Sequence, residues 1–244
     1  MTKLSVNINK VALLRNSRGR NYPDVAAFAA RCLELGAHGI TLHPRPDQRH
    51  ARYSDVAILR QICRAHGGEL NVEGFPDRPL LDAVLDARPD QCTLVPDQPG
   101  QLTSDHGWDA RAEASRLRPV IAELRGAGVR VSLFMDADYP DFDAARAVGA
   151  DRIELYTDPY AASFHRPDNA AVLQQYREAA RRANAAGLGV NAGHDLNLEN
   201  LASFLQIPNI LEVSIGHALT VECLEYGVAT VLSRYVAILG GRAM

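Results

Sequence analysis

The chain has 244 residues, of which 47% are hydrophobic, and a formal net charge of −3 at pH 7. This length is close to the roughly 250 residues of one eight-stranded α/β barrel, and the apolar content suffices for one large core. The small negative charge provides no general attraction to nucleic acid or anionic lipid, so neither is expected as a partner. The first residues lack the pattern of a signal peptide and no apolar run is long enough to span a bilayer, so we expect a cytoplasmic protein.

The hydrophobic pattern predicts eight short strands that alternate with helices. The expected strands cover residues 4–8, 39–43, 69–73, 92–95, 129–134, 152–156, 188–191 and 210–215. The expected helices cover about 24–36, 54–66, 79–87, 109–126, a short helix ending at 149, 169–186, 198–204 and 219–239. A long loop, residues 97–107, follows the fourth strand.

Eight such repeats with short connections predict an α/β fold, a closed parallel (β/α)8 barrel. No linker or low-complexity segment interrupts the chain, so we expect one domain over residues 1–244. The alternative is an open, doubly wound sheet, which would favour a G-x-G-x-x-G turn after the first strand. That turn is absent from the sequence.

Polar residues follow nearly every expected strand at its C-terminal end. They are Asn7, Asn9, Lys10, His43, Arg45, Glu73, Asp136, Asp138, Glu154, Asn191, His194, Gly216 and His217. In a (β/α)8 barrel these strand ends meet on one face, where active sites are built. The pattern therefore predicts an enzyme.

Several of these side chains can exchange protons near neutral pH. His43, His194 and His217 are candidate acid/base groups, and Glu73 is a candidate general base. Glu154 lies one position inside the rim and is a possible supporting acid or orienting group. In the purely structural alternative, the histidines only donate hydrogen bonds and Glu73 forms a salt bridge with Arg45.

Two loops are rich in arginine and predict anionic substrates. They carry Arg15, Arg18 and Arg20 after the first strand, and Arg45, Arg49, His50 and Arg52 after the second. Gly216 and His217 join the last strand to a helix N-terminus, which is a favourable place for a phosphate group. In the competing interpretation, these arginines only keep the loops solvated and bind no substrate.

A catalytic metal is the main competing use of His43, Glu73 and His194. The sequence has no H-E-x-x-H or similarly tight ligand spacing, so we predict no metal.

The motifs in combination resemble those of the pyridoxine 5'-phosphate synthase family. The matching segments run in order over essentially the whole chain: VNI, LRNSRG, GITLHPR, RH, VSLF, VNAGH and IGHA. The resemblance implies a barrel with a few added helices, assembled as a homo-octamer. It implies condensation of 1-deoxy-D-xylulose 5-phosphate with 3-amino-2-oxopropyl phosphate to pyridoxine 5'-phosphate, inorganic phosphate and water, without a metal or organic cofactor.

The resemblance also implies roles for individual residues. His43 and Glu73 correspond to proton acceptors, and His194 to a proton donor. Residues that correspond to substrate or phosphate contacts are Asn7, Arg18, Arg45, His50, Thr103, Gly216 and His217. Thr103 lies in the long loop after the fourth strand, which we interpret as a lid that excludes water.

The chain departs from a common family pattern at three places. Asn9 and Lys10 stand where many members have Asp-His, Asp195 stands where some have glycine, and residues 156–160 (YTDPY) vary from a His-Thr-Gly pattern. We expect Lys10 to bind a phosphate or substrate oxygen, Asp195 to contact substrate through its backbone, and Asn9 to support the site.

Two rival functions remain at this stage. Lys10 at a strand end is also suited to a Schiff base with a keto-phosphate, as in lysine-dependent aldolases. A non-catalytic phosphate-binding barrel would need the arginines and Gly216-His217 but would not need His43 and Glu73 together.

Overall fold

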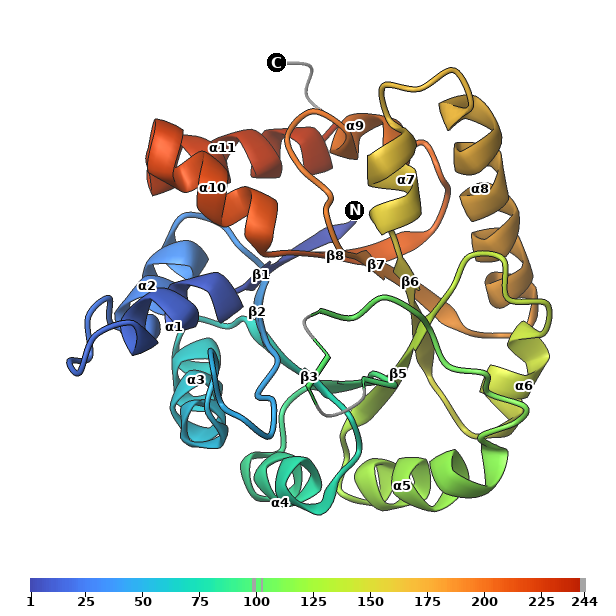
Figure 1. Cartoon of the computed structure of the whole chain (residues 1–244), viewed down its shortest axis with the longest axis horizontal. Helices are drawn as coiled ribbons and strands as arrows, with labels where there is room; N and C mark the ends of the chain where they lie inside the picture. The colour runs from blue at the N-terminus through green and yellow to red at the C-terminus, as the bar shows by residue number, and fades with distance from the viewer. Residues whose placement is uncertain (98–99, 102, 242–244) are drawn as a thin grey trace.

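A computed structural model describes residues 1–97, 100–101 and 103–241, and its eight parallel strands close into a barrel (Figure 1). Each strand pairs with the next one in the sequence, and the last pairs with the first. This confirms the predicted (β/α)8 barrel and excludes the open sheet. The strands are β1 (Lys3–Asn7), β2 (Gly39–Leu42), β3 (Glu69–Gly74), β4 (Gln91–Leu94), β5 (Arg130–Met135), β6 (Arg152–Tyr156), β7 (Gly189–Gly193) and β8 (Ile210–Ile215).

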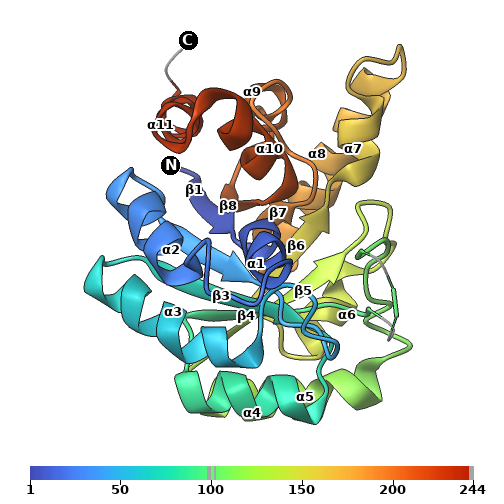
Figure 2. The same cartoon turned by 60° about the vertical axis from the view of Figure 1, so that its left-hand side comes forward.

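Helices cover the outside of the barrel, and α2 to α5 follow one another around it (Figures 1 and 2). None of the helices in the described part of the chain is long and apolar enough to cross a membrane. The helices are α1 (Asn9–Asn16), α2 (Val25–Glu34), α3 (Tyr53–Ala65), α4 (Arg78–Ala87), α5 (Ala114–Gly126), α6 (Phe142–Ala147), α7 (Asp158–Ser163), α8 (Asn169–Ala185), α9 (Leu201–Phe204), α10 (His217–Tyr226) and α11 (Val228–Leu239).

Three expectations about helices were wrong in detail. α1 begins directly after β1, where the sequence suggested a loop, and α5 begins at Ala114 rather than at 109. The expected helix 219–239 is two helices, because Gly227 between them has a φ of 80°, which a helix does not contain.

The strands present apolar side chains outward and polar side chains inward. Leu4, Val6, Leu70 and Val72 are fully buried members of the core that packs against the helices. Their neighbours Ser5 and Asn71, also buried, are polar. Since side chains of a strand alternate between its two faces, the hydrophobic core lies between barrel and helices. Many barrels instead fill their interior with branched apolar residues.

Hydrogen bonds across the interior connect these polar residues. Ser5 Oγ lies 2.6 Å from Thr41 Oγ1, and Thr93 Oγ1 donates to Asn71 Oδ1 at 3.0 Å. Thr93 Oγ1 also lies 3.4 Å from Glu154 Oε2, which joins β4 to β6 although these strands are not neighbours. The interior can therefore hold carboxyl groups out of water next to the rim.

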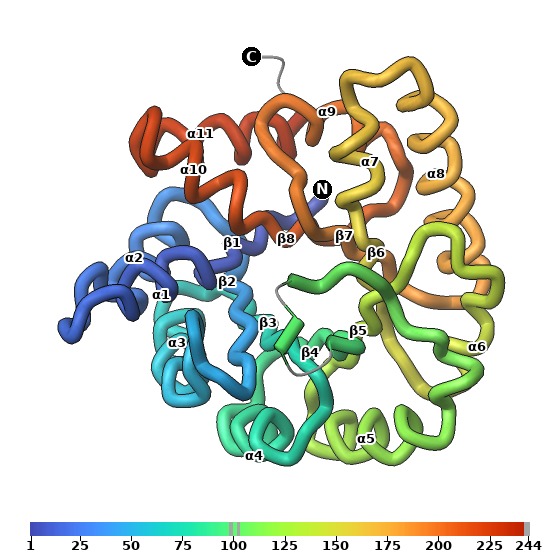
Figure 3. The backbone as a smooth tube through the Cα atoms, viewed as in Figure 1, coloured from blue at the N-terminus to red at the C-terminus, as the bar shows by residue number. Residues whose placement is uncertain are grey.

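The long loop after β4 passes in front of the barrel opening (Figure 3). Two backbone contacts hold its described part there: Gln101 O accepts hydrogen bonds from Arg45 and Arg49 of the loop after β2. The two loops thereby cover one side of the C-terminal face of the barrel.

Candidate active site

A cavity of about 530 Å³ lies at the C-terminal end of the strands. Its lining contains every residue predicted as catalytic, substrate-binding or supporting except Arg18. These are Asn7, Asn9, Lys10, His43, Arg45, His50, Glu73, Thr103, Glu154, His194, Asp195, Gly216 and His217. The strand-end residues Asp136, Asp138 and Asn191 are absent from the lining. The structure thus brings together residues from the ends of seven different strand segments, while their individual roles stay predictions.

The arginines after β1 behave differently from the expectation. Arg18 is exposed beyond the end of α1 and is absent from the cavity lining, so its phosphate contact stays a prediction. Arg15 is buried in α1, where its guanidinium forms a bidentate pair with Asp55 at 2.7 and 2.9 Å. Arg15 therefore ties α1 to α3 and does not face a substrate.

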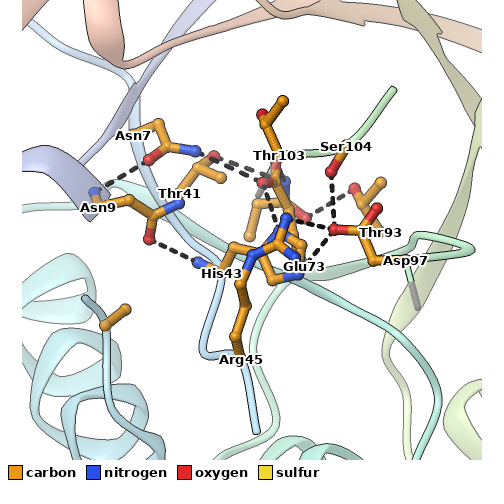
Figure 4. A network of polar contacts seen from close by, with 12 residues as sticks. Asn7, Asn9, Thr41, His43, Arg45, Glu73, Thr93, Asp97, Thr103 and Ser104 are labelled. Atoms are coloured by element: carbon orange, nitrogen blue, oxygen red, sulfur yellow. Dashed lines mark hydrogen bonds and ion pairs between the residues drawn. The ribbon is translucent and has the colours of Figure 1, made fainter. Parts of the chain in front are cut away.

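His43 is buried just beyond β2, between two carboxyl groups (Figure 4). Its Nδ1 lies 4.0 Å from Glu73 Oε2, and its Nε2 lies 3.8 Å from Asp97 Oδ2. The side chain of Asn9 accepts the His43 backbone N–H at 2.9 Å. Burial, and then the charge of Arg45, holds the pKa of His43 well below its usual value. The imidazole is therefore neutral near pH 7 and able to accept a proton.

Glu73 is buried in β3 beside His43. Asn7 Nδ2 donates to its Oε2 at 3.4 Å. Burial, and then the negative charges of Glu154 and Asp97, raises the pKa of Glu73 well above its usual value. The salt bridge to Arg45 that the sequence suggested was wrong, because Arg45 pairs with Asp97 instead. Both environments favour the neutral forms, so Glu73 holds an exchangeable proton beside a neutral His43.

Glu154 lies deeper in the barrel, on β6. Burial and the nearby Glu212 raise the pKa of Glu154 to about 8. Its carboxyl group lies against β7, and a Cβ at Gly193 would overlap it. Gly193 is therefore required for the close approach of β7 to Glu154. We expect Glu154 to act on Glu73 through its charge rather than by reaching far into the cavity.

One side of the cavity is cationic. Arg45 and Arg49 donate to the same backbone oxygen, Gln101 O, at 3.2 and 2.8 Å. Burial and these two arginines lower the pKa of His50 to about 4, so its imidazole is neutral. His50 Nδ1 accepts the Ala51 N–H at 2.9 Å, which leaves Nε2 as an N–H donor. Two guanidinium groups and one neutral donor match the needs of a phosphate group.

A second position suited to an anion lies at the start of α10. His217 is the first residue of this helix and Gly216 its N-cap, and both line the cavity. A Cβ at Gly216 would lie 2.9 Å from Asn7 Cβ, so only glycine permits this close approach to β1. The unpaired N–H groups and the dipole of a helix N-terminus attract phosphate.

His194 follows β7 and differs from His43 in being partly exposed, with 26% of its side chain accessible. Its Nδ1 lies 2.6 Å from Asp195 Oδ2 and its Nε2 3.0 Å from Thr103 Oγ1. The ring of Tyr156 packs against it edge-on, with 5.0 Å between the centroids. Its Nε2 is therefore the nitrogen on the side of the loop after β4.

Asp158, His194 and Asp195 also form the one group in the described ranges whose possible metal-ligating atoms all lie within 4.8 Å of one another. The hydrogen bond between His194 Nδ1 and Asp195 Oδ2 already uses two of the possible ligand atoms of this group. The expectation of a reaction without metal stays a prediction.

Asp97 is the main residue contacting this candidate site that the sequence interpretation missed. It is buried at 5% exposure, pairs with Arg45, and accepts a hydrogen bond from Ser104 Oγ at 2.9 Å. The signal was present, because Asp97 follows β4 as Glu73 ends β3, but it was read only as the start of a loop. Asp97 itself is absent from the cavity lining, whereas Ser104, Phe134 and Ser214, which the sequence interpretation did not single out, belong to it.

Comparison with known proteins gives a consistent family. The family described as "Pyridoxal phosphate biosynthesis protein PdxJ" matches residues 4–241. A pyridoxine 5'-phosphate synthase from Xanthomonas campestris pv. campestris is 54% identical over 250 residues, covering 99% of this chain and 98% of the relative. One from Brucella abortus is 49% identical over 243 residues, covering 98% and 99%.

Solved structures with much lower identity share the fold. The α-subunit of tryptophan synthase from Pyrococcus furiosus aligns with a TM-score of 0.66 at 15% identity, covering 98% of this chain and 97% of that one. A thiamine phosphate pyrophosphorylase from the same organism aligns with a TM-score of 0.64 at 17% identity, covering 98% and 96%. At this identity the likeness speaks for the barrel alone.

Proposed function

The chain belongs to the pyridoxal phosphate biosynthesis PdxJ family and is an enzyme that synthesises pyridoxine 5'-phosphate, and we propose that His43, Glu73 and His194 carry its proton transfers. The reaction condenses 1-deoxy-D-xylulose 5-phosphate with 3-amino-2-oxopropyl phosphate and releases inorganic phosphate and water. The observation that carries the proposal is one cavity that combines these three groups with two anion-binding positions.

Two phosphorylated substrates require two anion sites. We assign one phosphate to Arg45, Arg49 and His50, and the other to the N-terminus of α10 at Gly216 and His217. The two sites follow β2 and β8, the two strands that flank β1 in the barrel, and Glu73 lies on β3, next to β2. Lys10, exposed on α1 at the cavity, adds a positive charge close to the α10 site.

The chemistry needs both acceptors and donors of protons. Attack of the amine on the ketone and loss of water require a proton to leave nitrogen and a proton to reach the departing oxygen. Neutral His43 can take the first, with Glu73 as its exchange partner at 4.0 Å. His194, across the cavity, is assigned the donation to the departing oxygen. The loop that carries Thr103 contacts His194 Nε2 and would exclude water from an imine intermediate.

We also propose that the enzyme is cytoplasmic and assembles as a homo-octamer. Apolar side chains on α1 and α10 support self-association. Leu13 and Leu14 on α1, and Leu224 and Tyr226 on α10, are exposed, with Leu224 at 78%, and the two helices are in contact. Exposed apolar patches of this kind mark interaction surfaces. Mass photometry of the purified protein would test this, and a monomer at micromolar concentration would refute it.

The first test is a direct assay. Chelator-treated protein is mixed with both substrates, and pyridoxine 5'-phosphate is detected by mass and absorbance. Formation of product is expected, and its absence from folded protein that binds inorganic phosphate would overturn the assignment. Borohydride trapping with a keto-phosphate tests the aldolase alternative, for which a covalent adduct at Lys10 is required. Exposed Lys10 lacks the apolar surroundings that activate such a lysine, so no adduct is expected.

A further inference from the structure

The segment after β7 contributes to a cluster of polar side chains around His194. Asp195 Oδ2 lies 2.6 Å from His194 Nδ1. The carboxyl group of Asp158, the first residue of α7, lies beside this pair, and side-chain atoms of Asp158, His194 and Asp195 all lie within 4.8 Å of one another. Asp158 follows β6 and the other two follow β7, so two strand ends contribute to one cluster.

The backbone around His194 is held as well. Thr157 Oγ1 donates to Gly193 O at 2.8 Å and also to His194 O. Asn200 Nδ2 donates to Asp195 O at 3.2 Å. His194 and Asp195 have φ values of 92° and 58°, which residues other than glycine rarely adopt. Such a backbone persists because the surroundings hold it, so the His194 ring is fixed from both main chain and side chain.

The two carboxyl groups of the cluster are not equivalent. The hydrogen bond from His194 lowers the pKa of Asp195, whereas burial, and then the bond to Asp195, raises the pKa of Asp158. Asp195 is therefore the carboxylate, accepting from His194 on one side and from Asp158 on the other. Asp158 is the carboxylic acid, and the two groups together carry one proton.

We propose that Asp195, itself held by Asp158, is a positioning residue that keeps a proton on His194 Nδ1 and presents His194 Nε2 to the substrate. This inference rests on the proposed proton-donor role of His194. When the imidazolium gives its Nε2 proton to the departing oxygen, the electron pair of that N–H bond stays on Nε2. The neutral ring keeps its Nδ1 proton, bonded to Asp195, and regains the other from solvent.

A carboxylate on Nδ1 favours the neutral tautomer with its proton on Nδ1. The Nε2 lone pair is then free to take up the next proton from solvent, and the carboxylate stabilises the imidazolium that donates from Nε2. Positions 158 and 195 are two of those where this sequence departs from the family pattern. The structure places both departures in contact with each other and one in contact with the histidine, so they act as one unit. Glycine at either position could not supply the bond.

The kinetic test replaces Asp195 by glycine and by asparagine, because both residues tolerate the positive φ of this position. Asp195→Gly should lower kcat by roughly 10- to 100-fold, the loss typical of removing a carboxylate that orients a histidine. KM for both substrates should stay within about twofold, since the anion sites are untouched. Asp195→Asn retains an acceptor without the charge and should fall between wild type and Asp195→Gly.

Asp158 is tested in parallel. Asp158→Asn can still donate to Asp195 and should keep kcat within about twofold, whereas Asp158→Ala should lose about five- to tenfold, as for one hydrogen bond. The matched control is Glu199→Gln, because Glu199 forms an exposed pair with His165 at 3.1 Å, far from any proposed substrate contact. Its kcat should equal that of wild type.

A spectroscopic readout separates this inference from the proposed function. Nitrogen-15 NMR of labelled histidines, with His194→Gln to assign the signal, should show the Nδ1–H tautomer of His194 in wild type and a mixture in Asp195→Gly. If both kcat and tautomer are unchanged in Asp195→Gly while His194→Gln is inactive, the positioning role is refuted and the function stands. If His194→Gln is fully active, the proposed role of His194 fails. If wild type binds Mn²⁺ or Zn²⁺ and Asp195→Gly does not, with chelator abolishing turnover, a metal site replaces the proposal.

Discussion

Two histidines that line the same cavity lie in environments that suit opposite roles, one as a proton acceptor and the other as a proton donor. His43 is buried beside three cationic or histidine neighbours, and burial and their charges keep it neutral. His194 is partly exposed and is bonded through Nδ1 to the carboxylate of Asp195. A neutral, desolvated imidazole is suited to accept a proton, and one held by a carboxylate is suited to donate from its other nitrogen. The environment, rather than the residue type, therefore separates the two roles.

The difference follows from the strands that carry them. β2, β3 and β4 end in side chains that fold inward and bury one another: His43, Glu73 and Asp97, with Arg45 closing over Asp97 (Figure 4). The segment after β7 has positive φ at two residues, which turns it toward α7 and solvent. The first region controls protonation by desolvation, and the second by paired charge.

The largest effect should come from the buried region. Glu73→Gln keeps the shape and the hydrogen bond from Asn7 but removes the exchangeable proton. We expect kcat to fall by roughly 10²- to 10⁴-fold, the usual contribution of general acid–base catalysis, with substrate binding retained. Steady-state rates and binding of inorganic phosphate by calorimetry measure the two effects. Glu123→Gln, at an exposed pair with Arg78, is the control, and turnover of Glu73→Gln equal to that of the control would contradict the proton-transfer role.

Arg45→Met should disturb the buried region in two separable ways. It removes a phosphate ligand, so KM should rise by roughly tenfold or more. It also leaves Asp97, which is 5% exposed, without its cationic partner, which costs about 3–5 kcal/mol of stability for a buried ion pair. The double variant Arg45→Met/Asp97→Asn should recover stability in urea unfolding but not KM. If the double variant does not recover stability, the Arg45–Asp97 ion pair does not stabilise this part of the protein.

Glu154 should make stability depend on pH. Its folded pKa of about 8 exceeds its ordinary value of 4.5, so the folded state binds the extra proton between these values. Stability is therefore fully present below about pH 4.5 and is lost as pH rises toward 8. Glu154→Gln removes this loss, so its free energy of unfolding relative to wild type, measured by urea unfolding at several pH values, should increase with pH by at most about 1.4 kcal/mol per pH unit. If the stability difference between Glu154→Gln and wild type does not change with pH, Glu154 is charged in the folded protein over the whole pH range.

The smallest effect is expected at Arg18, which belongs to neither histidine region in the structure. If the segment after α1 folds over bound phosphate, Arg18→Gln should raise KM by roughly threefold and leave kcat unchanged, because an exposed guanidinium gains little from one ion pair. Arg20→Gln, also exposed in this segment, is the comparison. Equal KM in wild type and both variants would remove Arg18 from the site.

Much of the barrel could be predicted from local pattern. Short β-rich segments such as 4–8 and 69–73 predicted strands, and polar residues at nearly every strand end predicted the active face. Details that depend on how distant segments pack could not be predicted from the sequence. Arg15 was grouped with phosphate-binding arginines, but the fold of α1 against α3 brings it to Asp55. Gly227 looked like one position within a long helix, yet it separates α10 from α11.

The sequence by itself determined which acids, bases and cations stand at the strand ends. The order of its motifs also showed the resemblance to one family. That the whole chain is one domain stays a prediction from composition. Only the tertiary structure decided which groups are neutral and which are paired, because pKa depends on burial and on charges from distant segments. Asp97 lies 52 positions from Arg45, and Asp195 lies 37 positions from Asp158, so no local pattern could join them. Barrel closure brings both pairs together and thereby gives two histidines of one cavity different protonation behaviour.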